Sequence, residues 1–212
     1  ETALGQTSEK YESGGKGPGV INDYNNAAAG DLGGASYGTY QFASYLPTVM
    51  KNGKARPSSK GSPLELYLKN SKFKKEFDGL MPATASFDAK WKEVASANSA
   101  TFKEDQHDYV KRTYYNVAIA NIQRAGIDLT KFGPPVQDLV WSTAVQLGPG
   151  STTLKTFVTP LKGKSELTDR DIVNLVSDYK IGAVDALFAS SSATIRSGVK
   201  SRYQSEKSAL LA

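Results

Sequence analysis

Apolar side chains recur every three or four residues along most of the chain, a spacing that predicts helices. The longest such segment covers residues 101 to about 125 and is followed by Gly126, a residue type that commonly ends helices. A second segment begins at Pro134-Pro135 and is followed by Gly148-Pro149-Gly150. Its apolar residues occupy nearly all sides, which predicts a central buried helix; they are Val136, Leu139, Val140, Trp141, Ala144, Val145 and Leu147.

Shorter helices are predicted around these two. Pro63 favours the first turn of a helix that continues through Lys69, and Thr168 with Asp171 has the composition of an N-terminal cap. Residues 51–62 are rich in Gly, Pro, Ser and Lys, which predicts a loop. The other predicted helices cover residues 1–13, 40–50, 72–98, 168–179 and about 192–211.

Residues 14–38 have no helical period and are rich in Gly, Asn, Asp and Ala. Within them, Val20-Ile21 and Ser36-Tyr37 predict two short strands that pair with each other. A long irregular segment in a compact domain is usually functional or disordered, and the tyrosines favour a functional segment. The chain is therefore predicted to be mainly α, with a small β patch near an N-terminal cleft, and to form a single domain over residues 1–212.

The composition limits the available chemistry. The chain has no cysteine, which excludes disulfides and thiolate chemistry. His107 is the only histidine, so the His-rich zinc sites of peptidases are excluded. It lies between Asp105 and Asp108, in a segment that we interpret as a solvated helix face. We expect neither a metal ion nor a cofactor.

The chain carries a formal net charge of +5, and basic charge favours encounters with polyanions. The lysines are scattered rather than clustered, so we expect no nucleic-acid binding. No apolar run is long enough to span a membrane, which predicts no stable membrane insertion, and no secretory signal peptide opens the chain. The first residue is Glu1 rather than Met, which fits a trimmed chain or a domain cut from a longer polypeptide. We expect a monomer or a domain of a larger protein.

A glutamate at the end of the first predicted helix is a candidate for chemistry. Glu12 is followed by Ser13 and then by Gly14-Gly15, so its carboxyl group is expected to face a cleft. Cleavage of a glycosidic bond needs a proton donor at the leaving oxygen. An apolar setting, supplied by Tyr11 or Tyr37, would raise the pKa of Glu12 enough for this role. The alternative interpretation is an ordinary surface residue of a helix.

Glu12-Ser13, a loop, and the segment Gly34-Ala35-Ser36-Tyr37-Gly38-Thr39-Tyr40-Gln41 occur in this order and resemble the lysozyme-like superfamily. That superfamily includes goose-type lysozymes, soluble lytic transglycosylases and phage lysins. The resemblance implies an α+β lysozyme-like fold, and cleavage of the β-1,4 bond between N-acetylmuramic acid and N-acetylglucosamine with Glu12 as general acid. It also implies that the second segment binds sugar through Ser36, Tyr37, Tyr40 and Gln41.

Two aspartates are candidates for the second carboxylate of such a site. Asp31 stands before glycines at nearly the place of an Asp that, in goose-type lysozymes, orients the attacking water. A turn-forming Asp is the alternative interpretation, and Asp23 is a weaker candidate. A further Asp found beyond the motif in goose-type enzymes is missing. Hydrolysis by water, and attack by the C6 hydroxyl of muramic acid in a lytic transglycosylase, therefore both remain open.

Residues 143–150 end an apolar helix in Gly-Pro-Gly. They resemble a second segment of phage lysins and transglycosylases that closes the far side of the groove. The resemblance implies that Gln146 also contacts the sugar. A simple helix stop is the alternative interpretation.

Together these features predict a peptidoglycan glycosidase, either a muramidase or a lytic transglycosylase, whose partner is bacterial peptidoglycan. It would act on the cell wall as an antimicrobial phage endolysin, or as the lysin of a virion or a secretion spike. A non-catalytic wall-binding or structural module with a similar groove is the alternative. A nucleic-acid-binding module is disfavoured by the scattered lysines, and cleavage of chitin or chitosan would use the same pair of carboxylates.

Overall fold

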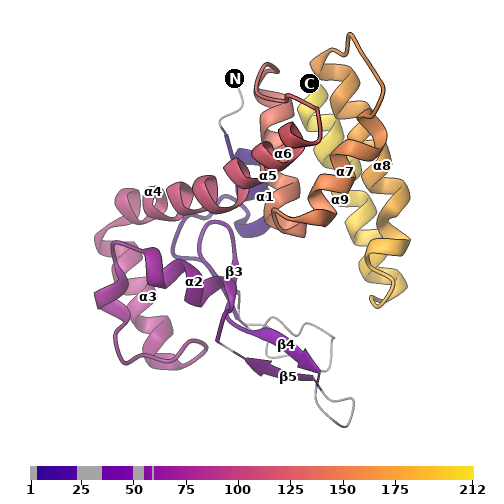
Figure 1. The fold of residues 1–212 in the computed structure, drawn as a ribbon. Helices are drawn as coiled ribbons and strands as arrows, with labels where there is room; N and C mark the ends of the chain where they lie inside the picture. Colours follow the sequence, from indigo (N-terminus) through magenta and orange to yellow (C-terminus); the bar gives the residue numbers. More distant parts are fainter. Residues whose placement is uncertain (1–3, 23–34, 50–54, 59) are drawn as a thin grey trace. The chain divides into compact units, whose positions relative to one another are not determined.

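The structure is a computed structural model that describes residues 4–22, 35–49, 55–58 and 60–212. The chain divides into two compact units (Figure 1). Unit 1 comprises residues 1–11 and 110–212, and unit 2 comprises residues 12–109. The prediction of a single domain over residues 1–212 stays a prediction.

Short strands form the front part of unit 2. Strands β1 (Ile21–Asn22), β2 (Ser36–Tyr37) and β3 (Phe42–Ala43) pair in this order as an antiparallel sheet. Ile21 lies opposite Tyr37, so the predicted pairing of these two segments is confirmed. Strands β4 (Leu46–Val49) and β5 (Ala55–Ser58) form a separate antiparallel pair, seen as two arrows in Figure 1.

The helices of unit 2 are α2 (Pro63–Asn70), the 3-10 helix η2 (Lys74–Phe77), α3 (Ala85–Ala97) and most of α4 (Ser99–Val110). Ser62 caps α2 and Thr84 caps α3, each through a side-chain oxygen that accepts a backbone N–H, which satisfies groups that a helix start leaves unpaired. The core of unit 2 is largely aromatic, because the rings of Tyr37, Phe77, Phe87, Phe102 and Tyr67 lie around Trp91.

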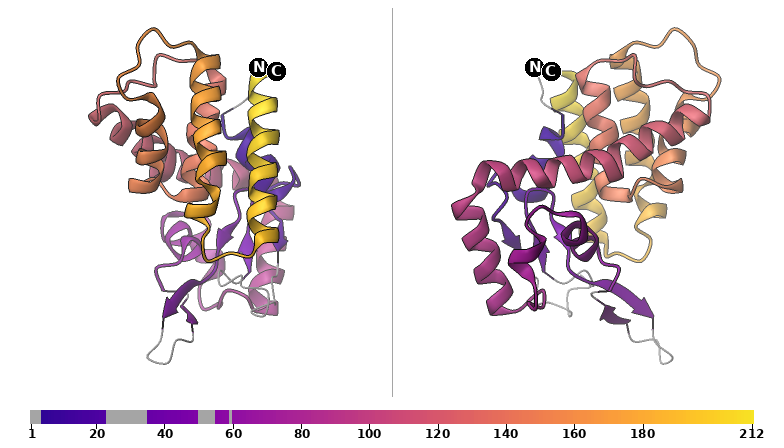
Figure 2. Two further views of the ribbon diagram at one scale, coloured as in Figure 1. Left: turned by 90° about the vertical axis from the view of Figure 1, so that its right-hand side faces the viewer. Right: turned by 60° about the vertical axis from the view of Figure 1, so that its left-hand side comes forward.

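Unit 1 is built from helices. Most of α1 (Gln6–Ser13) belongs to it, followed by the π-helical turn η3 (Lys111–Tyr115), α5 (Asn116–Arg124), α6 (Pro134–Leu147), α7 (Ser151–Leu161), α8 (Asp169–Leu187) and α9 (Ala193–Leu211). Helices α8 and α9 lie side by side, joined by a short turn (Figure 2). A capping box between Thr168 and Asp171 starts α8, as the sequence predicts.

Helix α6 is the central helix of unit 1. It contacts η3, α5, α7, α8 and α9, and its buried side chains lie on all sides. The prediction of a central buried helix over this segment is therefore confirmed. The apolar core around it contains Ala118, Ile122, Leu129, Val136, Leu139, Val140, Ala144, Phe157, Leu161, Ile172, Val173, Val176 and Leu210.

Two local predictions are wrong. Residues 40–49 do not form a helix, because β3 and β4 occupy residues 42–43 and 46–49, and part of the predicted loop 51–62 is strand β5. Gln41 has a φ of 56°, in the left-handed region that a continuing helix does not visit. Helix α7 has no counterpart among the predicted helices. The fold class is confirmed, since the described residues are mainly helical with a small antiparallel sheet.

Candidate functional site

Glu12 lies in the last turn of α1 and is half-buried. It is followed by the buried Ser13 and by Gly14 and Gly15, whose φ values of 64° and 71° belong to the left-handed region. Glycine adopts this conformation without the steric penalty of a side chain, so the helix stops here as the sequence predicts. The other predicted catalytic residue, Asp31, lies outside the described residues, as does Asp23.

The glycine-rich segment folds into a tight turn between β2 and β3. Gly38 has a φ of 85° and donates its N–H to the carbonyl of Val20 at 2.8 Å. A side chain on Gly38 would meet Oε1 of Gln106 at 2.6 Å. Gln106 in turn accepts the N–H of Thr39 at 2.8 Å, so the turn is packed directly against a buried amide of α4.

Gln41 holds this turn together through its side chain. Its Nε2 donates to the carbonyl of Gly38 at 2.9 Å, and its Oε1 accepts from Nδ2 of Asn22 at 2.6 Å. These bonds connect β1 with the turn and offset the cost of a positive φ at a residue other than glycine. The neighbouring Ser36 is half-exposed in β2.

Both tyrosines of the predicted sugar-binding segment are buried. Tyr37 is fully buried against Phe87 and Trp91, and its hydroxyl donates to Oδ1 of Asp88 at 2.6 Å. The hydroxyl of Tyr40 lies 2.9 Å from Nδ1 of His107. His107 is therefore half-buried beside an aromatic ring rather than on a solvated helix face.

Gln146 belongs to unit 1, whereas Glu12, Ser36, Tyr37, Tyr40 and Gln41 belong to unit 2. The amide oxygen of Gln146 accepts a hydrogen bond from the hydroxyl of Tyr203 at 2.7 Å. The structure thus gives several predicted site residues hydrogen bonds within the fold. Their assignment to sugar binding, and that of Glu12 and Asp31 to chemistry, stays a prediction.

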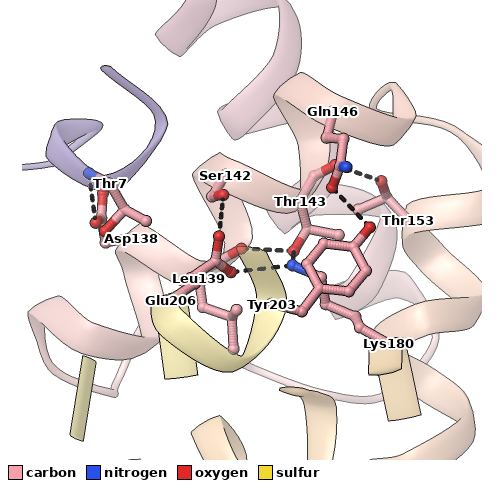
Figure 3. A network of polar contacts seen from close by, with 10 residues as sticks. All are labelled: Thr7, Asp138, Leu139, Ser142, Thr143, Gln146, Thr153, Lys180, Tyr203 and Glu206. Atoms are coloured by element: carbon pink, nitrogen blue, oxygen red, sulfur yellow. Dashed lines mark hydrogen bonds and ion pairs between the residues drawn. The ribbon is translucent and has the colours of Figure 1, made fainter. Parts of the chain in front are cut away.

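A buried polar network in unit 1 was not predicted (Figure 3). Nζ of Lys180, on α8, lies 3.0 Å from Oε1 of Glu206 on α9 and donates to Oγ1 of Thr143 at 3.1 Å. Ser142 donates to the other carboxylate oxygen of Glu206 at 2.7 Å. The ammonium group of Lys180 also lies 4.3 Å from the centre of the Tyr203 ring. Four charged or polar groups thus satisfy one another inside the helical bundle.

Burial dominates the electrostatics of this network. It lowers the pKa of Lys180, and the Glu206 carboxylate opposes the shift. It also raises the pKa of the Tyr203 hydroxyl. The pKa of Asp138, a fully buried residue of α6, is raised by burial and by Glu206, against hydrogen bonds from Gly5 and Thr7 that lower it.

The described residues contain no group of three His, Cys, Asp or Glu side chains placed to hold a metal ion. No helix among them has the length and apolar character needed to cross a membrane. A hollow of about 290 Å³ in unit 2 is lined by residues of α2 and by the segment that follows it, among them Leu68, Phe77 and Leu80. None of the predicted site residues lines it.

Comparison with known proteins decides the family. The model of the family described as "Type VI secretion system spike protein VgrG3-like, C-terminal" matches residues 4–207. The chain belongs to this family. It is 43% identical over 210 residues to the type VI secretion system spike protein VgrG3 of Vibrio cholerae serotype O1 (strain ATCC 39315 / El Tor Inaba N16961). The match covers 98% of this chain and 18% of that relative, so the chain spans less than a fifth of its length.

These matches correct the predicted identity. The resemblance to the lysozyme-like superfamily is wrong as a family assignment, because the VgrG3-like C-terminal family covers nearly the whole chain. Neither description names a peptidoglycan glycosidase, so the predicted muramidase or lytic transglycosylase is corrected to a domain of a type VI secretion spike protein. The prediction that the chain is a phage endolysin is wrong for the same reason. A secretion-spike component, which was one of the predicted contexts, is confirmed.

Proposed function

We propose that this chain acts as the C-terminal domain of a type VI secretion spike and leaves the cell together with the spike. The observation that carries the proposal is the family match over residues 4–207, supported by 43% identity to VgrG3 across 98% of the chain. The description of the family places the matched region at the C-terminal end of such proteins.

The fold is consistent with a module attached to a larger protein. Unit 1 has an apolar core around α6, and unit 2 has an aromatic core around Trp91. Both cores are built from residues within this chain, as is typical of a domain with its own hydrophobic core.

The test is export from the bacterium that encodes the chain. In the full-length protein, an epitope tag is placed after the residue numbered 212 in this chain. The tagged protein is then measured in cells and in culture supernatant. The strain with an active type VI secretion system is compared with one in which that system is inactivated. We expect the tag in the supernatant of the active strain alone, with a cytoplasmic protein as control for lysis. Equal release from both strains would contradict the proposal.

We also propose bacterial peptidoglycan as a partner of the domain. The net charge of +5 supports this, because a basic surface is attracted to anionic envelope polymers. Sedimentation with purified sacculi tests it, and we expect the chain in the pellet at low salt. Recovery in the pellet that is the same with and without sacculi would contradict the partner.

The residues of the predicted site can be tested in the same assay. Glu12→Gln and Glu9→Gln make the same chemical change on the same helix, and both side chains are half-buried. If Glu12 contacts the glycan, only Glu12→Gln changes the fraction bound. An equal change in both variants would show a general effect of charge.

A further inference from the structure

Helix α1 is bound to unit 1 by polar contacts instead of a large apolar face. Among the residues of α1 that belong to unit 1, Thr7 and Ser8 have almost fully buried side chains, and both are small and polar. Tyr11 is its one large aromatic residue and is half-buried. Burial of apolar surface is the main source of packing energy between helices, so α1 gains little from it.

The N-terminal turn of α1 is held by a carboxylate from a distant part of the sequence. Oδ1 of Asp138 accepts the N–H of Gly5 at 2.7 Å, and Oδ2 accepts the N–H of Thr7 at 3.1 Å. Figure 3 shows Asp138, on α6, facing Thr7. The first N–H groups of a helix have no partner within the helix. Asp138 supplies their acceptors from 131 and 133 positions away.

A second contact lies near the other end of the helix. The guanidinium carbon of Arg202, on α9, lies 5.1 Å from the centre of the Tyr11 ring, within the range of a cation–π interaction. Of the two contacts, the one with Asp138 is the more deeply buried, because the side chain of Asp138 is fully inaccessible to solvent. Hydrogen bonds to a buried charged group contribute more than those to exposed groups.

From this geometry we propose that Asp138 is a latch that holds residues 4–11 on unit 1, and that the strength of this hold depends on the protonation state of its carboxyl group. Asp138 acts here as a positioning residue. Helix α1 ends at Ser13, and unit 2 begins at Glu12 in its last turn.

The direction of the pH dependence follows from the surroundings of Asp138. Burial and the Glu206 carboxylate raise its pKa above the ordinary value of 3.8, whereas hydrogen bonds from Thr7 and Gly5 lower it. Burial, together with the charge of Asp138, raises the pKa of Tyr115 on η3. Glu206 is paired with Lys180. The hydrogen bonds that Gly5 and Thr7 donate on docking favour the ionised carboxyl group, so docking is strongest above the raised pKa and weakens as the pH falls through it.

The consequence for the protein rests on the proposed function. In a C-terminal domain the preceding polypeptide joins on the N-terminal side, and α1 is the first of the described helices from that side. A latch at this place sets how readily residues 4–11 are pulled from unit 1.

Amide hydrogen exchange of the 212-residue chain tests the latch, and it does not depend on secretion. Protection of residues 5–11 is measured across the acid range and divided by the intrinsic exchange rate at each pH. In the wild type we expect corrected protection to rise as the pH rises above 3.8 and then to level off. In Asp138→Asn we expect opening of α1 to increase about tenfold to a hundredfold, and its pH dependence to disappear.

Asp169→Asn is the matched control. Oδ2 of Asp169 accepts the N–H of Gly133 at 2.9 Å, which is the same kind of bond in the same unit. We expect it to lower protection around Gly133 and to leave α1 unchanged. Corrected protection of α1 that falls with pH in the wild type would overturn the latch, as would an equal effect of both variants on α1. The wild-type profile answers the question even if Asp138→Asn does not fold.

Discussion

Replacing Glu206 by alanine is expected to destabilise unit 1 strongly. Lys180 and Glu206 are each only 1% exposed, and their charged atoms are 3.0 Å apart. Without Glu206, the ammonium group of Lys180 and the hydroxyl of Ser142 lose the carboxylate that pairs with them inside the bundle. Removing one partner of a buried ion pair costs about 3–5 kcal/mol. Because whole domains are stable by only about 5–15 kcal/mol, this loss is a large fraction of the total.

An exposed ion pair on the same two helices provides the control. Nζ of Lys207, on α9, lies 2.7 Å from Oδ1 of Asp178 on α8, and the side chain of Asp178 is 62% exposed. Solvent screens such a pair, and its removal costs less than about 1 kcal/mol. Asp178→Ala therefore removes a contact of similar length between α8 and α9 without leaving a buried charge.

The assay is urea unfolding followed by far-ultraviolet circular dichroism, with the free energy of unfolding extrapolated to zero urea. The double variant Lys180→Met with Glu206→Leu replaces the pair by apolar side chains, and we expect it to recover most of the stability lost in Glu206→Ala. A cost of Glu206→Ala no larger than that of Asp178→Ala would refute the interpretation of the network as a buried, mutually dependent pair.

Three further predictions follow from local geometry. Gly38→Ala is expected to destabilise the chain more than Gly79→Ala. Both glycines have positive φ, but a side-chain carbon at residue 38 would meet Gln106, whereas one at residue 79 would meet nothing within 4 Å. Equal unfolding midpoints of the two variants would contradict this. Hydrogen bonds from Thr168 lower the pKa of Asp171 below its ordinary value of 3.8, so the stability that this cap contributes is present above 3.8 and is lost as the pH falls through the lowered pKa. An NMR titration is expected to show this lowered pKa moving back toward 3.8 in Thr168→Ala, and no movement would contradict the cap. The expected monomer is checked by light scattering, which should give a mass near 22.8 kDa for the isolated chain.

The helical part of the fold was predictable because its signals are local. The apolar positions of residues 136–147 exclude an exposed face, and α6 is the central helix of unit 1. Pro63 and Thr168 mark the starts of α2 and α8 in sequence and in structure. A helix was wrongly predicted for residues 40–50 because their apolar spacing also fits a helix. The tight turn at Gly38 and the positive φ of Gln41 depend instead on contacts with Asn22 and Gln106, which are distant in the sequence.

The family assignment failed for a related reason. The short glycine- and tyrosine-rich segment suggested a sugar-binding groove, but several of its residue types also meet needs of the fold. Gly38 fits where any side chain would collide with Gln106, and Tyr37 fills the aromatic core beside Trp91. A motif of this kind is compatible with more than one family, whereas the match over residues 4–207 uses nearly the whole chain.

The buried network could not be predicted from residue order. Asp138, Lys180 and Glu206 stand in three different helices, and charged residues in helices are usually exposed. A weak signal is present for Asp138, since a charged residue interrupts the apolar stretch of α6. Its partners, the N–H groups of Gly5 and Thr7, carry no side-chain signal at all.

The most direct test of the central claim is the size of the exported polypeptide that carries this chain. The secreted protein is captured by a tag after residue 212, and its intact mass is measured. We expect one polypeptide that contains both the spike and this domain, is far larger than the 22.8 kDa of the chain alone, and is absent from the supernatant when the type VI secretion system is inactive. A separate exported protein of about that smaller mass would contradict it, as would a chain that stays in the cell while the spike is secreted.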